Sequence, residues 1–278
     1  MKPRVEPSRG AARAITSLQN ERVKMIRALE MRKVRRETGQ FVAEGVSVLL
    51  MARDAGWKPA VLAFLSGSAR EGVAGDLLEW AERSGAECLE VSAAVLGKIA
   101  ARDNPQTMLA VFGQRWAEAP APGKVAGDAL WVVLEGVRDP GNLGTIIRTV
   151  DAAAASGVIL VGNSADPYSR EAVRATMGSI FNVPIVHLGI QKVHDWAKDW
   201  PGDVIGTHLE ARHDFRSVRY HAPTLLLMGS EGPGLSDDLR AVCTRTVKIP
   251  MSGRLDSLNL AVAAALVLYE MRKDRLSL

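Results

Sequence analysis

Three separated segments of the chain carry amide, carboxylate, hydroxyl and guanidinium groups beside glycines, at spacings that suit a ligand site. Residues 135–149 read EGVRDPGNLGTIIRT, residues 226–236 read LLMGSEGPGLS, and residues 249–260 read IPMSGRLDSLNL. The first two segments contain or follow apolar runs that predict buried strands. A loop between a parallel strand and the next helix is where α/β proteins usually bind ligands. The segments are therefore candidates for ligand contact.

The glycine-rich segment, residues 226–236, favours a particular class of ligand. Its glycines let the backbone approach a bound molecule or adopt positive φ. No Gly-Lys-Ser/Thr follows, so it is not a phosphate-binding P-loop, and the GxGxxG dinucleotide fingerprint is absent. Glu231 argues against a phosphate ligand, whereas an adenosine-type ligand recognised by backbone groups fits.

Each segment also has a purely structural interpretation. Residues 139–142 fit a simple turn, with Arg148 a solvated helix residue. Ser257 or Asn259 fits a helix cap, and the alanines at 261–265 fit close helix packing. Taken one at a time, the segments leave the chemistry open.

The elements that must position these segments alternate between strand and helix. In the second half, apolar runs predict buried parallel strands at residues 130–134, 158–161, 185–187, 204–207, 224–228 and 246–249. Helices are predicted at residues 144–156, 169–177, 193–199, 236–243 and 257–275. In the first half, strands are predicted at 41–44, 59–65, 87–91 and 108–112, with helices at 45–55, 74–84 and 92–102. Both halves therefore predict an α/β fold.

The positive charge of the chain is concentrated at its start. The net charge is +4, but residues 1–40 hold eleven Lys/Arg against four Glu, which is +7 and leaves −3 for the remainder. Residues 1–14 predict a flexible arm, and residues 17–36 predict one amphipathic basic helix. Either a polyanionic partner or a merely solvated charged face fits this asymmetry.

Composition excludes several classes of protein. No apolar run reaches the ~20 residues that span a bilayer, and no secretory signal is evident, so a cytoplasmic protein is expected. Cys88 and Cys243 predict buried free thiols, not a disulfide framework. The five histidines show no metal-ligand spacing, so no metal is expected.

Together the three segments resemble the SpoU (TrmH-like) family of RNA 2′-O-ribose methyltransferases, within the SPOUT superfamily. Its first motif, Asn-x-Gly…Arg, matches Asn142, Gly144 and Arg148. Its second, Gly-x-Glu-Gly, matches Gly229, Glu231 and Gly232. Its third, Ile-Pro-Met…Ser-Leu-Asn, matches the residues Ile249, Pro250, Met251, Ser257, Leu258 and Asn259. Residues 15–20 and 39–45 resemble the ribosomal-RNA branch of that family.

The resemblance implies a fold and an organisation into domains. It implies a C-terminal parallel-sheet SPOUT domain with a trefoil knot, and a smaller N-terminal α/β RNA-binding domain that resembles certain ribosomal proteins. The expected boundaries are a basic arm and helix at 1–38, a substrate-binding domain at 39–115, a linker at 116–128 and the methyltransferase domain at 129–278. A homodimer through the knotted domain is also implied, with no membrane partner.

The resemblance further implies S-adenosyl-L-methionine as cofactor and a ribose 2′-hydroxyl of RNA, in 23S ribosomal RNA, as substrate. The implied catalytic residues are Arg148, Asn142, Glu231, Ser257 and Asn259. The implied cofactor-binding residues are Gly229, Gly232, Ile249, Met251 and Leu258. The residues expected to bind RNA are Arg22, Lys24, Arg27, Arg32, Lys33, Arg35 and Arg36.

Three alternatives remain open at this point. A transfer-RNA 2′-O-methyltransferase would carry the same motifs. A non-catalytic RNA-binding or ribosome-assembly factor could use the same fold, although it would not need the set Asn142, Arg148, Glu231 and Asn259. Base methylation, as in other SPOUT members, is the third alternative.

Overall fold

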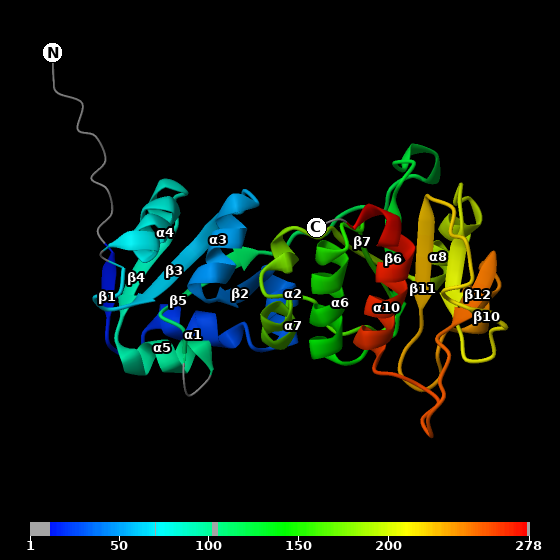
Figure 1. The fold of residues 1–278 in the computed structure, drawn as a ribbon. Coiled ribbons are helices and arrows are strands. Elements are labelled where there is room, and N and C mark those ends of the chain that lie inside the picture. The colour runs from blue at the N-terminus through cyan, green and yellow to red at the C-terminus, as the bar shows by residue number, and fades with distance from the viewer. Residues whose placement is uncertain (1–11, 70, 102–104, 277–278) are drawn as a thin grey trace, which may run out of the picture. The chain divides into compact units, whose positions relative to one another are not determined.

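The chain folds into two compact units, Met1–Gln114 and Arg115–Leu278. The computed structural model describes residues 12–69, 71–101 and 105–276. Each unit is built on a sheet of its own with helices packed against it (Figure 1). The predicted α/β class is confirmed for both.

The N-terminal unit contains a mixed five-stranded sheet in the order β1-β4-β3-β5-β2. Its strands are β1 (Arg13–Ile15), β2 (Gln40–Glu44), β3 (Pro59–Leu65), β4 (Glu87–Val91) and β5 (Met108–Gly113). Strands β1 and β3 run parallel to β4, while β5 is antiparallel to β2 and β3. The arm that we expected to be flexible over residues 1–14 is thus paired from Arg13 onward, and residues 1–11 lie outside the described residues.

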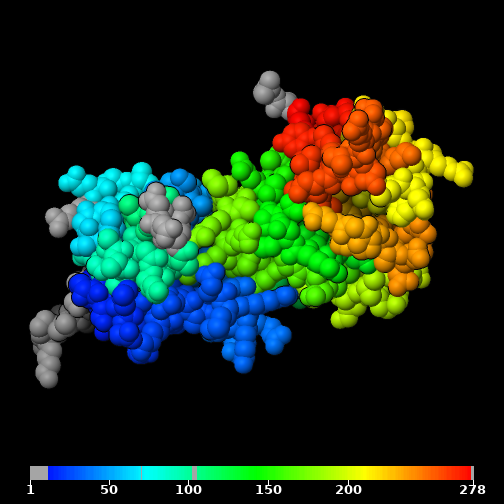
Figure 2. All heavy atoms as spheres, turned by 90° about the horizontal axis from the view of Figure 1, so that it is seen from below, coloured from blue at the N-terminus to red at the C-terminus, as the bar shows by residue number. Residues whose placement is uncertain are grey.

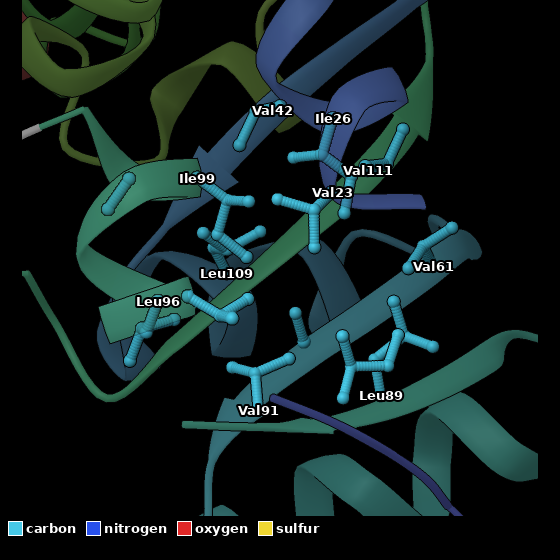
Figure 3. Close-up of a cluster of buried hydrophobic side chains, with 14 of the residues drawn as sticks. Val23, Ile26, Val42, Val61, Leu89, Val91, Leu96, Ile99, Leu109 and Val111 are labelled. Carbon is cyan, nitrogen blue, oxygen red and sulfur yellow. The ribbon is translucent and has the colours of Figure 1, made fainter. Parts of the chain in front are cut away.

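Helices cover both faces of this sheet. Helices α1 (Glu21–Ala28) and α5 (Ala93–Ala100) bury Val23, Ile26 and Leu96 against valines and leucines of the strands, as Figure 3 shows. Helices α3 (Val46–Asp54) and α4 (Gly72–Arg83) pack on the other face. There an aromatic cluster forms, in which the Phe41 and Phe112 rings lie 5.9 Å apart. Two packed faces explain why the central strands read as continuous apolar runs.

The basic helix that we expected over residues 17–36 is in fact two helices. Helix α1 ends at Ala28, and α2 spans Arg32–Thr38. Met31 between them is extended, with ψ 126°. The Arg35 guanidinium, only 4% exposed, donates to the carbonyls of Leu29 at 2.8 Å and Glu30 at 2.7 Å. It thereby satisfies carbonyls that the end of α1 leaves without helical partners.

The C-terminal unit contains a seven-stranded parallel sheet in the order β10-β12-β9-β11-β6-β7-β8. Its strands are β6 (Leu130–Glu135), β7 (Gly157–Val161), β8 (Ile185–Leu188), β9 (Val204–Thr207), β10 (His213–Asp214), β11 (Thr224–Met228) and β12 (Arg245–Lys248). Six of these strands were predicted from their apolar runs. The seventh, β10, was missed because it has two residues and no apolar run.

Helices again lie on both faces of this sheet. Helices α6 (Pro140–Ala152), α7 (Arg170–Ala175) and α10 (Leu260–Arg272) pack together, with α6 in contact with the other two (Figure 1). Helices α8 (Ile190–Lys198) and α9 (Asp237–Arg240) pair over the opposite cluster, which contains Trp131, Val133 and Leu227. Residues 115–128 run along this unit: the Ala117 amide donates to Ile185, and the Trp196 indole donates to Pro120.

Both cysteines are free thiols, as predicted; Cys88 is buried, whereas Cys243, which was also expected to be buried, is only partly so. Burial raises the pKa of Cys88 to about 11 and that of Cys243 to about 12, so both thiols are protonated at neutral pH. Across the described residues, no helix combines the length and apolarity needed to cross a bilayer.

The buried guanidinium of Arg35 provides a test of the N-terminal unit. We expect Arg35→Met to lower the free energy of unfolding by about 2 to 4 kcal/mol, because one buried and one partly buried carbonyl lose a charged donor. The matched control is Arg36→Met, since Arg36 is exposed on the same helix. Urea denaturation would measure both variants, and equal stabilities would contradict the role given to Arg35.

Candidate active site

The three motif segments meet because of the parallel sheet. Strands β6, β11 and β12 run in the same direction, so their carboxyl ends lie at one edge of the sheet. The first motif follows β6, the second follows β11 and the third follows β12. The second and third motifs, in orange, and α10, in red, lie together at the surface in Figure 2. This edge is the usual ligand-binding edge of an open parallel sheet.

One residue from each motif joins a continuous chain of side-chain hydrogen bonds. Asn259 Nδ2 donates to Asn142 Oδ1 at 2.9 Å, and Asn142 Nδ2 donates to Glu231 Oε1. These contacts link positions 117 and 89 residues apart in the sequence. Three segments that are weak signals separately therefore form one polar site.

Which groups donate and which accept in this series of hydrogen bonds is fixed at both ends. Asn259 is the N-cap of α10, and its Oδ1 accepts from the amides of Ala261 at 2.9 Å and Val262 at 3.3 Å. Only its amino group is then left for Asn142. An ionised Glu231 is acceptor-only, so Asn142 must turn its own amino group to it. The cap interpretation of Asn259 is correct, and the same side chain also belongs to the site.

The second motif forms a tight reversal that presents Glu231 at its tip. Ser230 and Gly234 form an isolated bridge, and the Gly234 amide donates to the Ser230 carbonyl at 3.1 Å. A Cβ on Gly229 would lie 1.9 Å from the Gly234 carbonyl carbon, while Gly232 has φ +102°. Glycine is therefore required at 229 for close approach and is favoured at 232 by its backbone conformation.

Helix α6 begins at Pro140, earlier than the predicted residue 144. Asp139 is its N-cap and accepts from the Asn142 amide at 2.6 Å, and Pro140 takes the first helical position. A Cβ on Gly144 would lie 2.3 Å from the Ala172 carbonyl oxygen, so this glycine lets α6 pack against α7. Asn142 is thus held in the rigid first turn of a helix.

Sequence reasoning assigned no role to Asp139 or Glu135, two carboxylates that position the site. Glu135 Oε2, at the end of β6, accepts from the Ser236 amide at 2.8 Å and anchors the far end of the second motif. The Asp-Pro pair is a helix-start signal that could have identified Asp139. The contact of Glu135 spans 101 residues and has no local signal.

The structure does not bring every predicted site residue into this hydrogen-bonded chain. Arg148 is exposed on α6, roughly 9 Å further along the helix axis than Asn142. Within the described residues, its guanidinium makes no hydrogen bond or ion pair. Ser257 is exposed and donates to Asp256 at 3.1 Å. Their roles stay predictions.

The predicted cofactor-binding residues of the third motif lie at its exposed surface. Met251 is 37% exposed and Leu258 36%, and Ile249 is partly buried. Within the described chain, residues 250–258 make no main-chain hydrogen bond. Their peptide groups and apolar side chains are thus available to a ligand. No cluster of three His, Cys, Asp or Glu residues suited to a metal occurs among the described residues.

The predicted RNA-binding cations of the N-terminal unit differ from one another in exposure and in ion pairing. Arg22 pairs with Glu87 at 2.8 Å, Lys24 with Glu21 at 2.7 Å and Lys33 with Glu37 at 3.9 Å. Arg35 is buried at the end of α1 and does not face solvent. Arg27, Arg32 and Arg36 are exposed.

Comparison with known proteins agrees with this arrangement. Residues 129–269 match the SpoU rRNA Methylase family, and residues 20–110 match the MRM3-like substrate binding domain. A 23S rRNA (uridine(2479)-2′-O)-methyltransferase of Streptomyces viridochromogenes is 34% identical over 96% of this chain and 94% of that protein. The 23S rRNA (guanosine(2553)-2′-O)-methyltransferase RlmP of Bacillus subtilis is 28% identical over 93% of this chain and 98% of that protein.

A solved structure is similar over both units. The AdoMet-bound rRNA methyltransferase from Sinorhizobium meliloti has 41% sequence identity and a TM-score of 0.88, and the match covers 96% of this chain and all of that one. The fold, the joined motifs and these matches show that the chain belongs to the SpoU family of rRNA methylases. The resemblance seen in the sequence is thereby confirmed.

The close approach at Gly229 provides a test of the site's geometry. We expect Gly229→Ala to lower the free energy of unfolding by about 1 to 3 kcal/mol, because the added methyl group overlaps the backbone at Gly234. Gly127→Ala is the control, since a Cβ there meets nothing within 4 Å. Chemical denaturation followed by tryptophan fluorescence would compare the two, and a stable Gly229→Ala would show that the loop can open without cost.

Proposed function

We propose that this protein transfers a methyl group from S-adenosyl-L-methionine to a ribose 2′-hydroxyl of 23S ribosomal RNA. The observation that carries the proposal is the hydrogen-bonded chain Asn259–Asn142–Glu231, which joins the three family motifs at the ligand edge of the sheet. Two relatives that match nearly the whole chain are named for ribose methylation of 23S rRNA, which favours ribosomal over transfer RNA.

The residues present suit S-adenosylmethionine, which supplies an electrophilic methyl group on a sulfonium sulfur. The backbone groups of residues 250–258 can recognise the adenine edge and the amino-acid portion of the cofactor, beside the apolar Met251 and Leu258 side chains. Gly229 lets the second motif fold back against Gly234, and Gly232 supplies a positive φ of +102°. Glu231 places a carboxylate there, which suits a cationic cofactor better than a phosphate.

Arg148 is the residue that we assign to the reacting hydroxyl. A ribose 2′-hydroxyl is a poor nucleophile while protonated, so the site must stabilise the oxyanion that develops as it attacks the methyl carbon. A guanidinium keeps its proton in proteins, so Arg148 acts as a cation rather than as a base, and the hydroxyl proton leaves to solvent water. It would orient the ribose-phosphate and stabilise the alkoxide, while Asn142 is held rigid to hold the sugar or Arg148 itself.

A homodimer would complete the site. Val262, Leu266 and Tyr269 follow one another at helical spacing on α10 and are 49%, 42% and 46% exposed. Such an apolar stripe is typical of a protein contact surface. We propose that a second copy covers it and that Arg148 of one protomer serves the partner's cofactor site. We also propose that the C-terminal unit contains the trefoil knot that membership of this family implies.

RNA delivery is assigned to the N-terminal unit. Its match to a substrate binding domain and its exposed cations, Arg27, Arg32 and Arg36, support this role. Arg22, Lys24 and Lys33 can add phosphate contacts at the expense of their ion pairs, which are weak because they are solvent-exposed.

Substitution of Arg148 tests the catalytic assignment. We expect Arg148→Ala to lower kcat on the order of 10²-fold or more, because one electrostatic contact to the transition state is lost. Tritiated S-adenosylmethionine with 23S rRNA would measure the rate, and filter binding would confirm that RNA is still bound. Near-normal turnover by Arg148→Ala with RNA bound would contradict the assignment.

The same assay separates the alternatives. Label in transfer RNA alone would identify a tRNA enzyme, and label on a base in a nuclease digest would identify a base methyltransferase. RNA bound without any label would identify a binding factor.

Introducing a charged residue on α10 tests the proposed dimer surface. We expect Leu266→Asp to raise the dimer dissociation constant at least about thirtyfold, as loss of a central apolar contact does. Leu209→Asp is the matched control, because Leu209 is 61% exposed and belongs to the loop between β9 and β10, not to α10. Light scattering after size exclusion would measure both, and an unchanged mass for Leu266→Asp would reject this surface.

A further inference from the structure

Helices α6 and α10 are tied to each other at both ends. At their amino ends, Asn259 donates to Asn142 at 2.9 Å. At their carboxyl ends, Arg272 Nη2 donates to the carbonyl of Ala154, just past the last turn of α6, at 3.1 Å. Arg272 Nη1 donates to the Asp128 carbonyl, before β6, at 3.0 Å. Asn259 and Arg272 therefore restrain opposite ends of α10.

The segment that leads into α10 provides little restraint. Within the described chain, residues 250–258 make no main-chain hydrogen bond, and all nine are exposed. The position of Asn259 must therefore come from the packing of α10 itself. That packing uses small and aliphatic side chains such as Ala261, Ala264 and Leu268, which bury area without fixing a direction.

Arg272 supplies the directional restraint that the packing lacks. Arg272 is only 6% exposed, and its two amino groups reach carbonyls in two different loops, before β6 and after α6. The guanidinium is planar, so two such contacts define its orientation. It also places a positive charge at the carboxyl end of α6, where the helix dipole favours a cation.

A small rotation of α10 would be enough to break the site. A turn of roughly 30° about the helix axis moves an atom about 5 Å from that axis by about 2.6 Å. That exceeds the tolerance of a hydrogen bond. The contact of Asn259 with Asn142 therefore depends on the rotation at which α10 is held.

We propose that Arg272 is a positioning residue for methyl transfer, which sets the rotation of α10 and thereby the contact between Asn259 and Asn142. Arg272 lies at the end of α10 opposite Asn259, so it does not touch the reacting atoms. The catalytic consequence rests on the proposed function, whereas the structural consequence can be measured without it.

The structural consequence is measured by selective ¹⁵N labelling of asparagine. The chain has six asparagines, and their side-chain amide resonances can be assigned by single substitutions. In Arg272→Met we expect the Asn142 and Asn259 side-chain resonances to shift or broaden, while Asn20 in the N-terminal unit stays unchanged. Arg272→Lys can reach one carbonyl at most and should give a smaller change; it also decides the question if Arg272→Met does not fold.

The catalytic consequence is a change in kcat rather than in RNA affinity. We expect Arg272→Met to lower kcat about tenfold, equal to about 1.4 kcal/mol, with the KM for RNA changed less than twofold. In an Asn259→Ala background the same substitution should cost less than twofold, because the contact that it positions is already absent. Arg275→Ala is the control, since it removes only the exposed pair with Asp128, and both readouts should match the unsubstituted protein.

Unchanged Asn142 and Asn259 resonances in folded Arg272→Met or Arg272→Lys would overturn the proposal. A tenfold loss of kcat caused by Arg272→Met in the Asn259→Ala background would also overturn it. If the unsubstituted protein methylates no RNA, the proposed function fails, and the resonances alone still decide whether Arg272 positions Asn259.

Discussion

The side-chain amide of Asn142 links the three motifs of the C-terminal unit. It accepts from Asn259 and donates to Glu231, so one side chain holds together three loops that the sequence places far apart. Each partner is itself fixed: Asn259 caps α10, and Glu231 sits on a reversal that only glycine at 229 permits. A parallel sheet is what makes this meeting possible, because it collects the ends of β6, β11 and β12 at one edge.

The proposed function divides the work on RNA between the two units. The C-terminal unit holds a hydrogen-bonded site in which the Asn142 and Asn259 side-chain amides meet the Glu231 carboxylate, and the Arg148 guanidinium is exposed further along α6. Such a site suits a small cationic cofactor and one ribose, not a length of RNA. The N-terminal unit contributes a rigid sheet, packed on both faces, that carries basic helices on its surface. Under the proposed function, RNA binding and methyl transfer would belong to units with separate hydrophobic cores.

Much of the architecture could be predicted from the sequence, because strands buried on both faces read as uninterrupted apolar runs. Residues 130–134 and 224–228 are examples. Features that depend on the burial or the long-range contact of one polar side chain could not be predicted. Arg35, which caps the end of α1, reads as another basic residue until its burial is known. Likewise, Glu135 and Arg272 act through main-chain groups of residues distant in sequence. Asn259 had two interpretations: the structure shows that it caps α10 and contacts Asn142, and its catalytic role stays a prediction.

If the N-terminal helices bind RNA as proposed, their ion pairs determine how that binding responds to ionic strength. Each phosphate neutralised by a free cation releases a condensed counterion, and this release sets the slope of affinity against salt concentration. A cation already paired with a carboxylate, such as Arg22 with Glu87, must first give up that partner. Arg35 is buried, so it cannot neutralise a phosphate and releases no counterion. The salt sensitivity of this protein on RNA is therefore governed by its uncompensated surface charge, which is smaller than the eleven basic residues among the first forty would imply.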